Sequence, residues 1–128
     1  MKKICLLLVL LLVVSVSFAG AADLKVADGT ITTAIENQMP VDRIESHPAD
    51  FGKLYCFTRI VGAQEDTEVT HVWYYRGEEM ARVTLAVRSA DWRTYSSKRF
   101  LPQWAGEWKV VVLDNEENEI ATFPFVLE

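Results

Sequence analysis

Apolar and polar residues alternate with a period of two over residues 71–75 and again over residues 80–87, on either side of a turn signal at Gly77. Alternation of this kind is typical of strands that present one face to a core and the other to solvent. We therefore predict a β-hairpin with its turn at Gly77. The two faces of its first strand carry Val72 and Tyr74 on one side and His71, Trp73 and Tyr75 on the other.

The number of residues in the turn determines which face of this hairpin is buried. A turn of two or four residues places odd positions of the first strand opposite even positions of the second. Val72 and Tyr74 then belong to the core, while Trp73 lies opposite Met80 or Arg82 on a half-exposed face. A different turn length reverses the assignment, and Trp73 becomes the buried tryptophan that many immunoglobulin-like sandwiches have on their third strand.

Five further segments have strand-like composition, and turn signals separate them at intervals of about ten residues. Regular short strands of this kind predict an all-β fold, a two-sheet antiparallel sandwich that is immunoglobulin-like and has about seven strands. We expect residues 53–62 to form a central strand, because both faces are apolar, and Pro124 to mark an edge or a bulge. The other segments are residues 31–36, 92–100, 107–112 and the stretch of Phe123, Phe125 and Leu127.

The first of these strands is expected to follow a turn at residues 27–30 and to end before Pro40. The polar stretch from Pro40 to Gly52 has no sustained alternation of apolar and polar residues. It is interpreted as a long surface connection with at most one helical turn.

The first 22 residues have the three regions of a secretory signal: a basic start, an apolar run over residues 4–16, and small residues before Asp23. We expect residues 1–22 to be a cleaved signal peptide and residues 23–128 to form a single β-sandwich domain. The apolar run is shorter than the roughly 20 residues that span a bilayer, and no cysteine at the cleavage site offers a lipid attachment point. The predicted location is periplasmic or secreted, with no stable membrane anchor after cleavage.

Charge is distributed unevenly along the expected domain. Residues 71–104 carry 6 basic and 3 acidic side chains, whereas residues 23–70 carry 4 and 9 and residues 105–128 carry 1 and 6. We expect no nucleic-acid partner, because nonspecific binding needs a broadly basic face, but the basic middle leaves room for a local anionic ligand. Cys56 is the single cysteine of the expected domain, which excludes an intramolecular disulfide and predicts a small apolar core residue.

Motifs for catalysis and cofactor binding are missing from the sequence. It has no nucleophile elbow, no zinc-protease motif, no glycine-rich phosphate loop and no dinucleotide fingerprint. Ser96 or Ser97 could pair with His71, but nothing in their spacing requires the geometry of a nucleophile and its base. The candidate metal ligands His47, His71 and Cys56 lack ligand spacing. We therefore expect a noncatalytic protein without a cofactor or a metal.

Four blocks in order carry a resemblance to a known family; they are Gly52–Ile60, His71–Tyr75 with Glu79–Val83, Trp92–Lys98, and Gly106 with Trp108. On these blocks the chain resembles the bacterial family catalogued as domain of unknown function 2914, from about Ile31 to Leu127. The resemblance implies one exported or membrane-attached domain and brings no established activity or ligand. The chain departs from the family's early Arg-Glu-Pro, where it has Gln38-Met39-Pro40.

The mixed face of the hairpin is the candidate site, because aromatic planes and arginine donors suit sugars and anionic groups. We predict an exported noncatalytic binding module that recognises an envelope glycan or another exported protein through this face. The alternative is a scaffold that pairs with its partner by adding a strand to an exposed sheet edge. The predicted ligand-binding residues are His71, Trp73, Tyr75 and Arg82, with Arg93 and Lys98 as additions.

Overall fold

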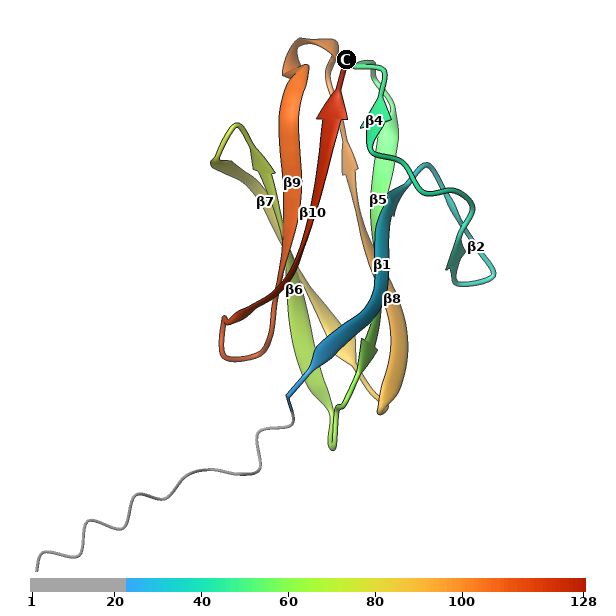
Figure 1. Ribbon diagram of the computed structural model, residues 1–128, viewed down its shortest axis with the longest axis vertical. Helices are drawn as coiled ribbons and strands as arrows, with labels where there is room; N and C mark the ends of the chain where they lie inside the picture. The colour runs from blue at the N-terminus through green and yellow to red at the C-terminus, as the bar shows by residue number, and fades with distance from the viewer. Residues whose placement is uncertain (1–22) are drawn as a thin grey trace, which may run out of the picture.

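The computed structural model describes residues 23–128, and the predicted signal peptide, residues 1–22, lies outside the described residues. Two layers of strands face each other along the long axis of the molecule (Figure 1). The three-stranded sheet has the order β1-β5-β8, and the five-stranded sheet has the order β4-β10-β9-β6-β7. The long strands are β1 (Lys25–Thr32), β5 (Lys53–Val61), β6 (Thr67–Tyr75), β7 (Glu78–Val87), β8 (Asp91–Arg99), β9 (Gly106–Leu113) and β10 (Glu119–Leu127).

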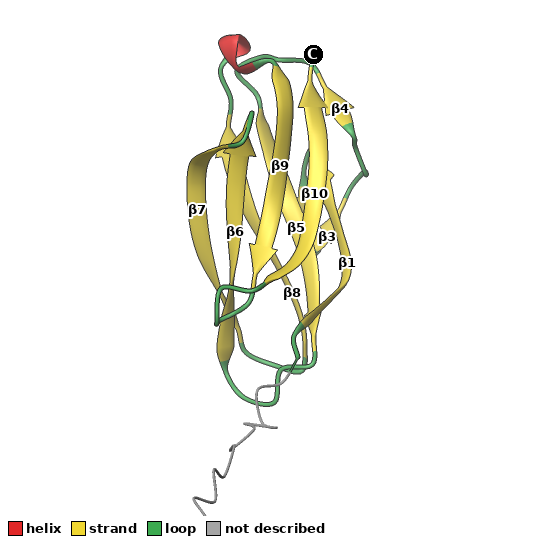
Figure 2. Cartoon of the chain, turned by 60° about the vertical axis from the view of Figure 1, so that its left-hand side comes forward, coloured by secondary structure: helices red, strands yellow, loops and turns green. Residues whose placement is uncertain are grey.

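Four short elements complete the fold, and one of them, β4, pairs in parallel with the end of β10. The 3-10 helix η1 follows β8 at the same end of the molecule as the C-terminus (Figure 2). The predicted sandwich of about seven antiparallel strands is confirmed, but the connection expected after Pro40 contains β4 and no helical turn. The short elements are β2 (Ile35–Glu36), β3 (Met39–Pro40), β4 (Ser46–His47) and η1 (Pro102–Trp104).

Alternate side chains of both sheets point inward and form the core, as the pleat of a strand requires. An aromatic cluster with ring centroids 4.8 to 6.1 Å apart fills one end, and each such pair contributes about 0.5–1.5 kcal/mol beyond its buried area. Cys56 is fully buried on β5, which is the central strand of its sheet as predicted. Burial raises the pKa of its thiol, so Cys56 is an unreactive packing residue. The cluster consists of Trp73, Phe100, Trp108 and Phe125.

The hairpin of β6 and β7 has one of the predicted turn lengths. Tyr75 pairs with Glu78, so Arg76 and Gly77 form a two-residue turn. Both turn residues have positive φ, 48° for Arg76 and 82° for Gly77. Two residues of positive φ give a turn whose twist matches that of the strands it joins.

A β-bulge next to this turn reverses the predicted pairing, in which odd positions of β6 lie opposite even positions of β7. Tyr74 pairs with Glu79, but Trp73 pairs with Ala81, so Met80 is an extra residue on β7. Beyond the bulge, odd positions of β6 lie opposite odd positions of β7. The odd face of β6 therefore points into the core, and the prediction that it is half exposed is wrong.

The predicted turn at residues 27–30 is also wrong, because these residues lie inside β1. The sequence suggested a turn at Gly29, but a glycine is needed here because a side chain would not fit. A Cβ atom at Gly29 would lie 2.2 Å from Cζ of Phe123, which approaches from β10. Gly29 therefore leaves space for an aromatic ring that packs between the edges of the two sheets.

Pro124 lies on the edge of the five-stranded sheet, as predicted. Within the sheet, β4 pairs only with Val126 and Leu127 of β10. The N–H of Val126 points away from β9 and donates to the carbonyl oxygen of Glu45 at 2.9 Å. The nitrogen of Pro124, two residues earlier, lies on the same side of β10, so this stretch of the edge lacks a donor.

Candidate functional site

The predicted recognition face is part of the core. His71 and Trp73 are both 0% exposed. Ser96 Oγ on β8 lies 2.7 Å from His71 Nδ1 and accepts a hydrogen bond from Trp73 Nε1 at 3.1 Å. Thr58 Oγ1 on β5 lies 3.1 Å from His71 Nε2. The assignment of His71 and Trp73 to ligand binding is therefore wrong, because their polar atoms bind the opposite sheet.

This buried network also bears on the possible pairing of a serine with His71. Burial lowers the pKa of His71 to about 4, so the imidazole is neutral at neutral pH. A neutral imidazole has one donor and one acceptor, which two hydroxyl groups can satisfy. Ser96 is 4% exposed and Thr58 is 0% exposed. The network joins the two sheets and presents no reactive group to solvent.

Tyr75 and Arg82 lie on opposite sides of the five-stranded sheet, so their predicted grouping on one face is wrong. Tyr75 is half-buried on the core side, where its ring centroid lies 4.9 Å from that of Trp108. Its hydroxyl donates to the carbonyl oxygen of Ala105 at 2.6 Å. Arg82 is exposed on the outer side and donates to the carboxylate of Glu79 at 2.9 Å.

Arg93 and Lys98 belong to the other sheet, on β8. Arg93 is exposed on the outer side and lies opposite Arg59 of β5. Lys98 lies toward the open end of the core, where its Nζ is 4.7 Å from the ring centroid of Trp104. Burial lowers the pKa of Lys98. The six predicted residues are thus distributed over both sheets and do not form one site.

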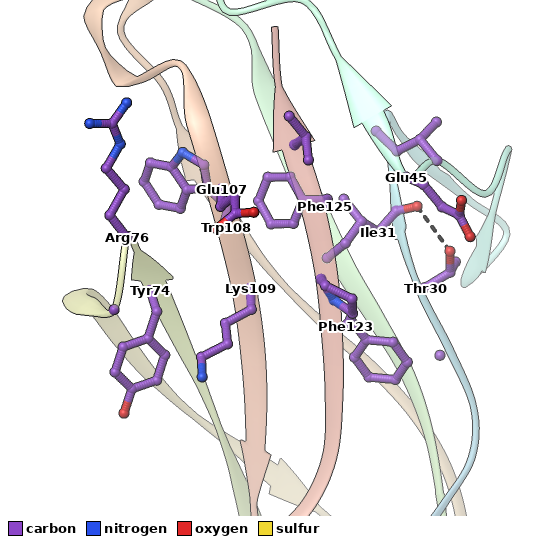
Figure 3. Close-up of a pocket in the computed structure, with 15 residues that line it drawn as sticks. Thr30, Ile31, Glu45, Tyr74, Arg76, Glu107, Trp108, Lys109, Phe123 and Phe125 are labelled. Atoms are coloured by element: carbon purple, nitrogen blue, oxygen red, sulfur yellow. Dashed lines mark hydrogen bonds between the residues drawn. The ribbon is translucent and has the colours of Figure 1, made fainter.

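A groove of about 970 Å³ provides a different candidate site. It crosses β10 between the β6–β7 turn and the edge of β1, and Figure 3 shows the side chains that line it. Apolar side chains of β10, from Phe123 to Val126, form the floor. Charged groups lie at the two ends, with Arg76 and Lys109 at one end and Glu45 at the other (Figure 3).

Tyr74 and Lys109 form the outer wall of the basic end. They are cross-strand partners on β6 and β9, so both lie on the outer side of the sheet. The Nζ atom of Lys109 lies 5.4 Å from the centroid of the Tyr74 ring, within the range of a cation–π interaction. Glu107, two residues before Lys109, also lines this end. Two cations and one carboxylate therefore give the end a net positive charge.

Arg76 is held at the groove by its turn and by a glycine. Its guanidinium donates to the carbonyl oxygen of Ala105 at 3.3 Å and packs over the backbone of Gly106. A Cβ atom at Gly106 would lie 2.9 Å from Nε of Arg76, and Gly106 has a φ of 129°. Only glycine adopts this conformation readily and leaves this space. The backbone thus positions the guanidinium beside the groove.

The acidic end is held by a loop between the two sheets. Ile44 donates its N–H to the carbonyl oxygen of Ile31 on β1 at 3.0 Å, and Glu45 accepts from Val126 on β10. These two bonds place Glu45 across the groove from the cations. Val126 on the floor is 39% exposed. The groove therefore has an apolar floor accessible to solvent and ends of opposite charge.

The predicted hairpin contributes Tyr74, Arg76 and Gly77 to the groove, but none of the residues predicted to bind a ligand. From the sequence, Tyr74 was expected in the core and Arg76 only in the turn. One signal could have identified Arg76: asparagine, aspartate or glycine normally occupies the first position of such a turn, because a side chain at positive φ is strained. An arginine in that position is therefore a candidate for a functional side chain.

Comparison with known families supports the resemblance. Residues 66–127 match the family described as "Protein of unknown function (DUF2914)". The chain carries a DUF2914 region. This region contains β6 to β10, and therefore the basic end and the floor of the groove, whereas β1 and β5 lie outside the match. A comparison with curated proteins finds no match.

A solved structure supports the fold. The chain is similar to the CARDB domain of the PF1109 protein from Pyrococcus furiosus, in complex with di-metal ions, with a TM-score of 0.51 and 12% sequence identity. The similarity covers 79% of this chain and 86% of that chain. That domain is an immunoglobulin-like β-sandwich, and the DUF2914 region lies in a sandwich of the same class. At this identity the likeness concerns the fold alone.

Two further observations concern residues 23–128 only. Within this range, no three histidine, cysteine, aspartate or glutamate side chains come close enough together to hold a metal ion. The same range contains no helix with the length and apolar character needed to cross a membrane.

Proposed function

We propose that this protein is an exported noncatalytic binding module, and that the groove across β10 recognises an extended segment of another exported protein. The observation that carries the proposal is the accessible apolar floor between ends of opposite charge. An extended segment has a similar layout, with apolar side chains along one face and charged groups at its ends.

Apolar lining favours a protein segment over a glycan. Trp108 and Phe125 line the groove but are almost fully buried, and the Nζ of Lys109 lies over one face of the Tyr74 ring. The rings of Trp108 and Phe125 therefore present no open face for a sugar to stack on, and a cation occupies one face of Tyr74. Apolar side chains of a peptide can instead fill the space along Phe123 and Val126 and remove that surface from water.

The edges of the five-stranded sheet favour recognition by side chains over addition of a strand. Pro124 removes a donor from the free edge of β10, and the bulge at Met80 distorts the outer strand β7. Prolines and bulges are devices by which natural sheets prevent pairing at their edges. Strand addition therefore becomes the second candidate.

Binding of synthetic peptides tests the groove directly. The probes are short extended peptides with alternating apolar residues, an acidic residue at one end and a basic residue at the other, measured by isothermal titration calorimetry. We expect Arg76→Asn combined with Lys109→Gln to weaken binding about tenfold, because two charge pairs are lost. Asparagine adopts positive φ readily, so the turn beside Gly77 keeps its conformation and the thermal midpoint stays close to that of the parent.

Arg82→Gln is the matched control, because Arg82 is an exposed arginine of the same hairpin that does not line the groove. It should leave peptide affinity unchanged. Equal losses in both proteins, or no loss in either, would contradict the assignment of the groove. Tighter binding of a neutral oligosaccharide than of any peptide would contradict the choice of a protein segment.

A further inference from the structure

The outward face of the three-stranded sheet is basic in an acidic chain. The registers of β1, β5 and β8 identify which side chains share this face. Its charged strand residues are five basic and two acidic, while the whole chain has 13 basic and 18 acidic residues. They are Lys25, Lys53, Arg59, Arg93 and Arg99, with Asp28 and Asp91.

Two cross-strand pairs on this face place like charges directly opposite each other. Arg59 lies opposite Arg93, and Lys53 lies opposite Arg99. Like charges in such positions repel and destabilise a sheet. Asp91 compensates Arg59 through an ion pair at 2.6 Å, whereas none of the ion pairs within residues 23–128 involves the other three cations. The Nζ of Lys53 lies 5.1 Å from the centroid of the Tyr55 ring, whereas Arg93 and Arg99 remain available to an anionic ligand.

Two tyrosines lie between the charged pairs. The rings of Tyr55 and Tyr95 contact each other edge to face, with centroids 5.9 Å apart, and Tyr95 is 46% exposed. Ser97 lies opposite Tyr55 on the same face and adds a hydroxyl group. Aromatic faces pack against the C–H groups of sugar rings, and hydroxyl groups bond to sugar hydroxyls. The centre of the face therefore suits an uncharged sugar better than a charged group.

The spacing of the cations indicates the kind of polymer. Arg93 and Arg99 are six residues apart on β8, which corresponds to about 20 Å along an extended strand. The outward residues between them on β8, Tyr95 and Ser97, are uncharged. Each strand of a nucleic-acid duplex carries a phosphate about every 3.4 Å, so most phosphates along this face would lack a cation. A polymer with widely spaced anionic groups fits better.

We propose that the outward face of β5 and β8 binds an acidic polysaccharide. Its carboxylate or phosphate groups pair with Arg93 and Arg99, and the sugars between them pack on Tyr95. Neither β5 nor β8 lines the groove, so the proposal does not depend on the peptide site.

The test uses two soluble probes in which uncharged sugars separate the anionic groups: hyaluronan, with a carboxylate on every second sugar, and a polymer in which sugar phosphates alternate with neutral sugars. Dextran is the uncharged control. We expect at least one of the acidic polymers to bind, with an affinity that falls as salt is added. Arg93→Gln combined with Arg99→Gln should weaken that binding about tenfold. The thermal midpoint should stay the same or rise, because both cross-strand repulsions are relieved.

Tyr95→Ala tests the packing of sugars and should weaken binding without changing its salt dependence. The matched control is Arg76→Asn with Lys109→Gln, which removes two cations from the groove and should leave polymer binding unchanged. Preference for the carboxylate or the phosphate polymer identifies the anionic group, and either result supports the proposal. Equal binding of dextran, tighter binding of a single-stranded oligonucleotide, or full binding by the Arg93 and Arg99 double variant would overturn it.

Discussion

His71 illustrates how single residues define the core of this protein. Both ring nitrogens lie within hydrogen-bond distance of hydroxyl groups from the opposite sheet, Thr58 on β5 and Ser96 on β8. Ser96 also accepts from Trp73, so one hydroxyl serves two side chains. Buried polar groups stabilise a fold only when all of them are satisfied, and then they favour one arrangement of the sheets.

We expect the protein to lose stability in mild acid because of His71. Its pKa is lowered from 6.5 to about 4 in the folded state, so the unfolded chain takes up a proton first as the pH falls. The stabilising effect is complete above about pH 6.5 and is lost below about pH 4. The difference corresponds to about 3 kcal/mol in the free energy of unfolding. Urea titrations over this pH range measure it.

His71→Gln should reduce the dependence of unfolding free energy on pH between 6.5 and 4, whatever its effect on stability at neutral pH. His47→Gln is the control, because it replaces the only other histidine and leaves the core network intact. If His71→Gln keeps the full slope of the parent, protonation of His71 is not its cause.

At the level of whole elements, hydrophobic alternation is enough to locate most of the strands but not to orient them. The segments around Cys56 and Trp73 were identified because alternate residues are apolar over several positions. The orientation of β6 depends on Met80, and nothing in the local sequence distinguishes a bulged residue from a paired one. One extra residue on β7 therefore moved the predicted site from the solvent side to the core.

The groove could not be predicted from the sequence for a related reason. It joins Arg76 on a turn, Lys109 on β9 and Glu45 in a loop, which come together only through the order of strands in the sheet. Gly29 predicts a turn from the sequence, because glycine is common in turns, but glycine also occurs where a ring needs space. The sequence shows the glycine, and only the fold shows the ring of Phe123 beside it.

The contact between Gly29 and Phe123 leads to a prediction about the open side of the sandwich. Gly29→Ala should lower the free energy of unfolding by about 1–3 kcal/mol, because the added methyl group overlaps the Phe123 ring. In a Phe123→Leu background the same change should cost less, since the distal ring atoms are gone. A double-mutant cycle from urea unfolding measures this coupling, and additive effects would show that the two residues do not interact in this way.

For the molecule as a whole, the two proposed surfaces use different strands. The groove lies across β10 and reaches the edge of β1, whereas the proposed polysaccharide site is the outward face of β5 and β8. Under the two proposals, the protein would hold a protein segment and a polysaccharide at the same time. Such a role is consistent with the expected export of the chain.

Export itself is testable through the N-terminal residue. When the full chain is produced in a bacterial host, we expect the protein recovered from the periplasm or the medium to begin between Gly20 and Asp23. Intact-mass spectrometry measures this directly. Recovery of the chain with Met1 and the following apolar run still attached would contradict the prediction of a cleaved signal.

Backbone amide shifts of the labelled protein, recorded while the mixed-charge peptide is added, test the central proposal most directly. We predict that the affected amides cluster along β10 from Phe123 to Val126, around Lys109 on β9 and at the turn of Arg76 and Gly77. Shifts confined to the free edge of β7 or β8 would indicate strand addition instead. Absence of shifts along β10 at saturating peptide would contradict the groove as the recognition site.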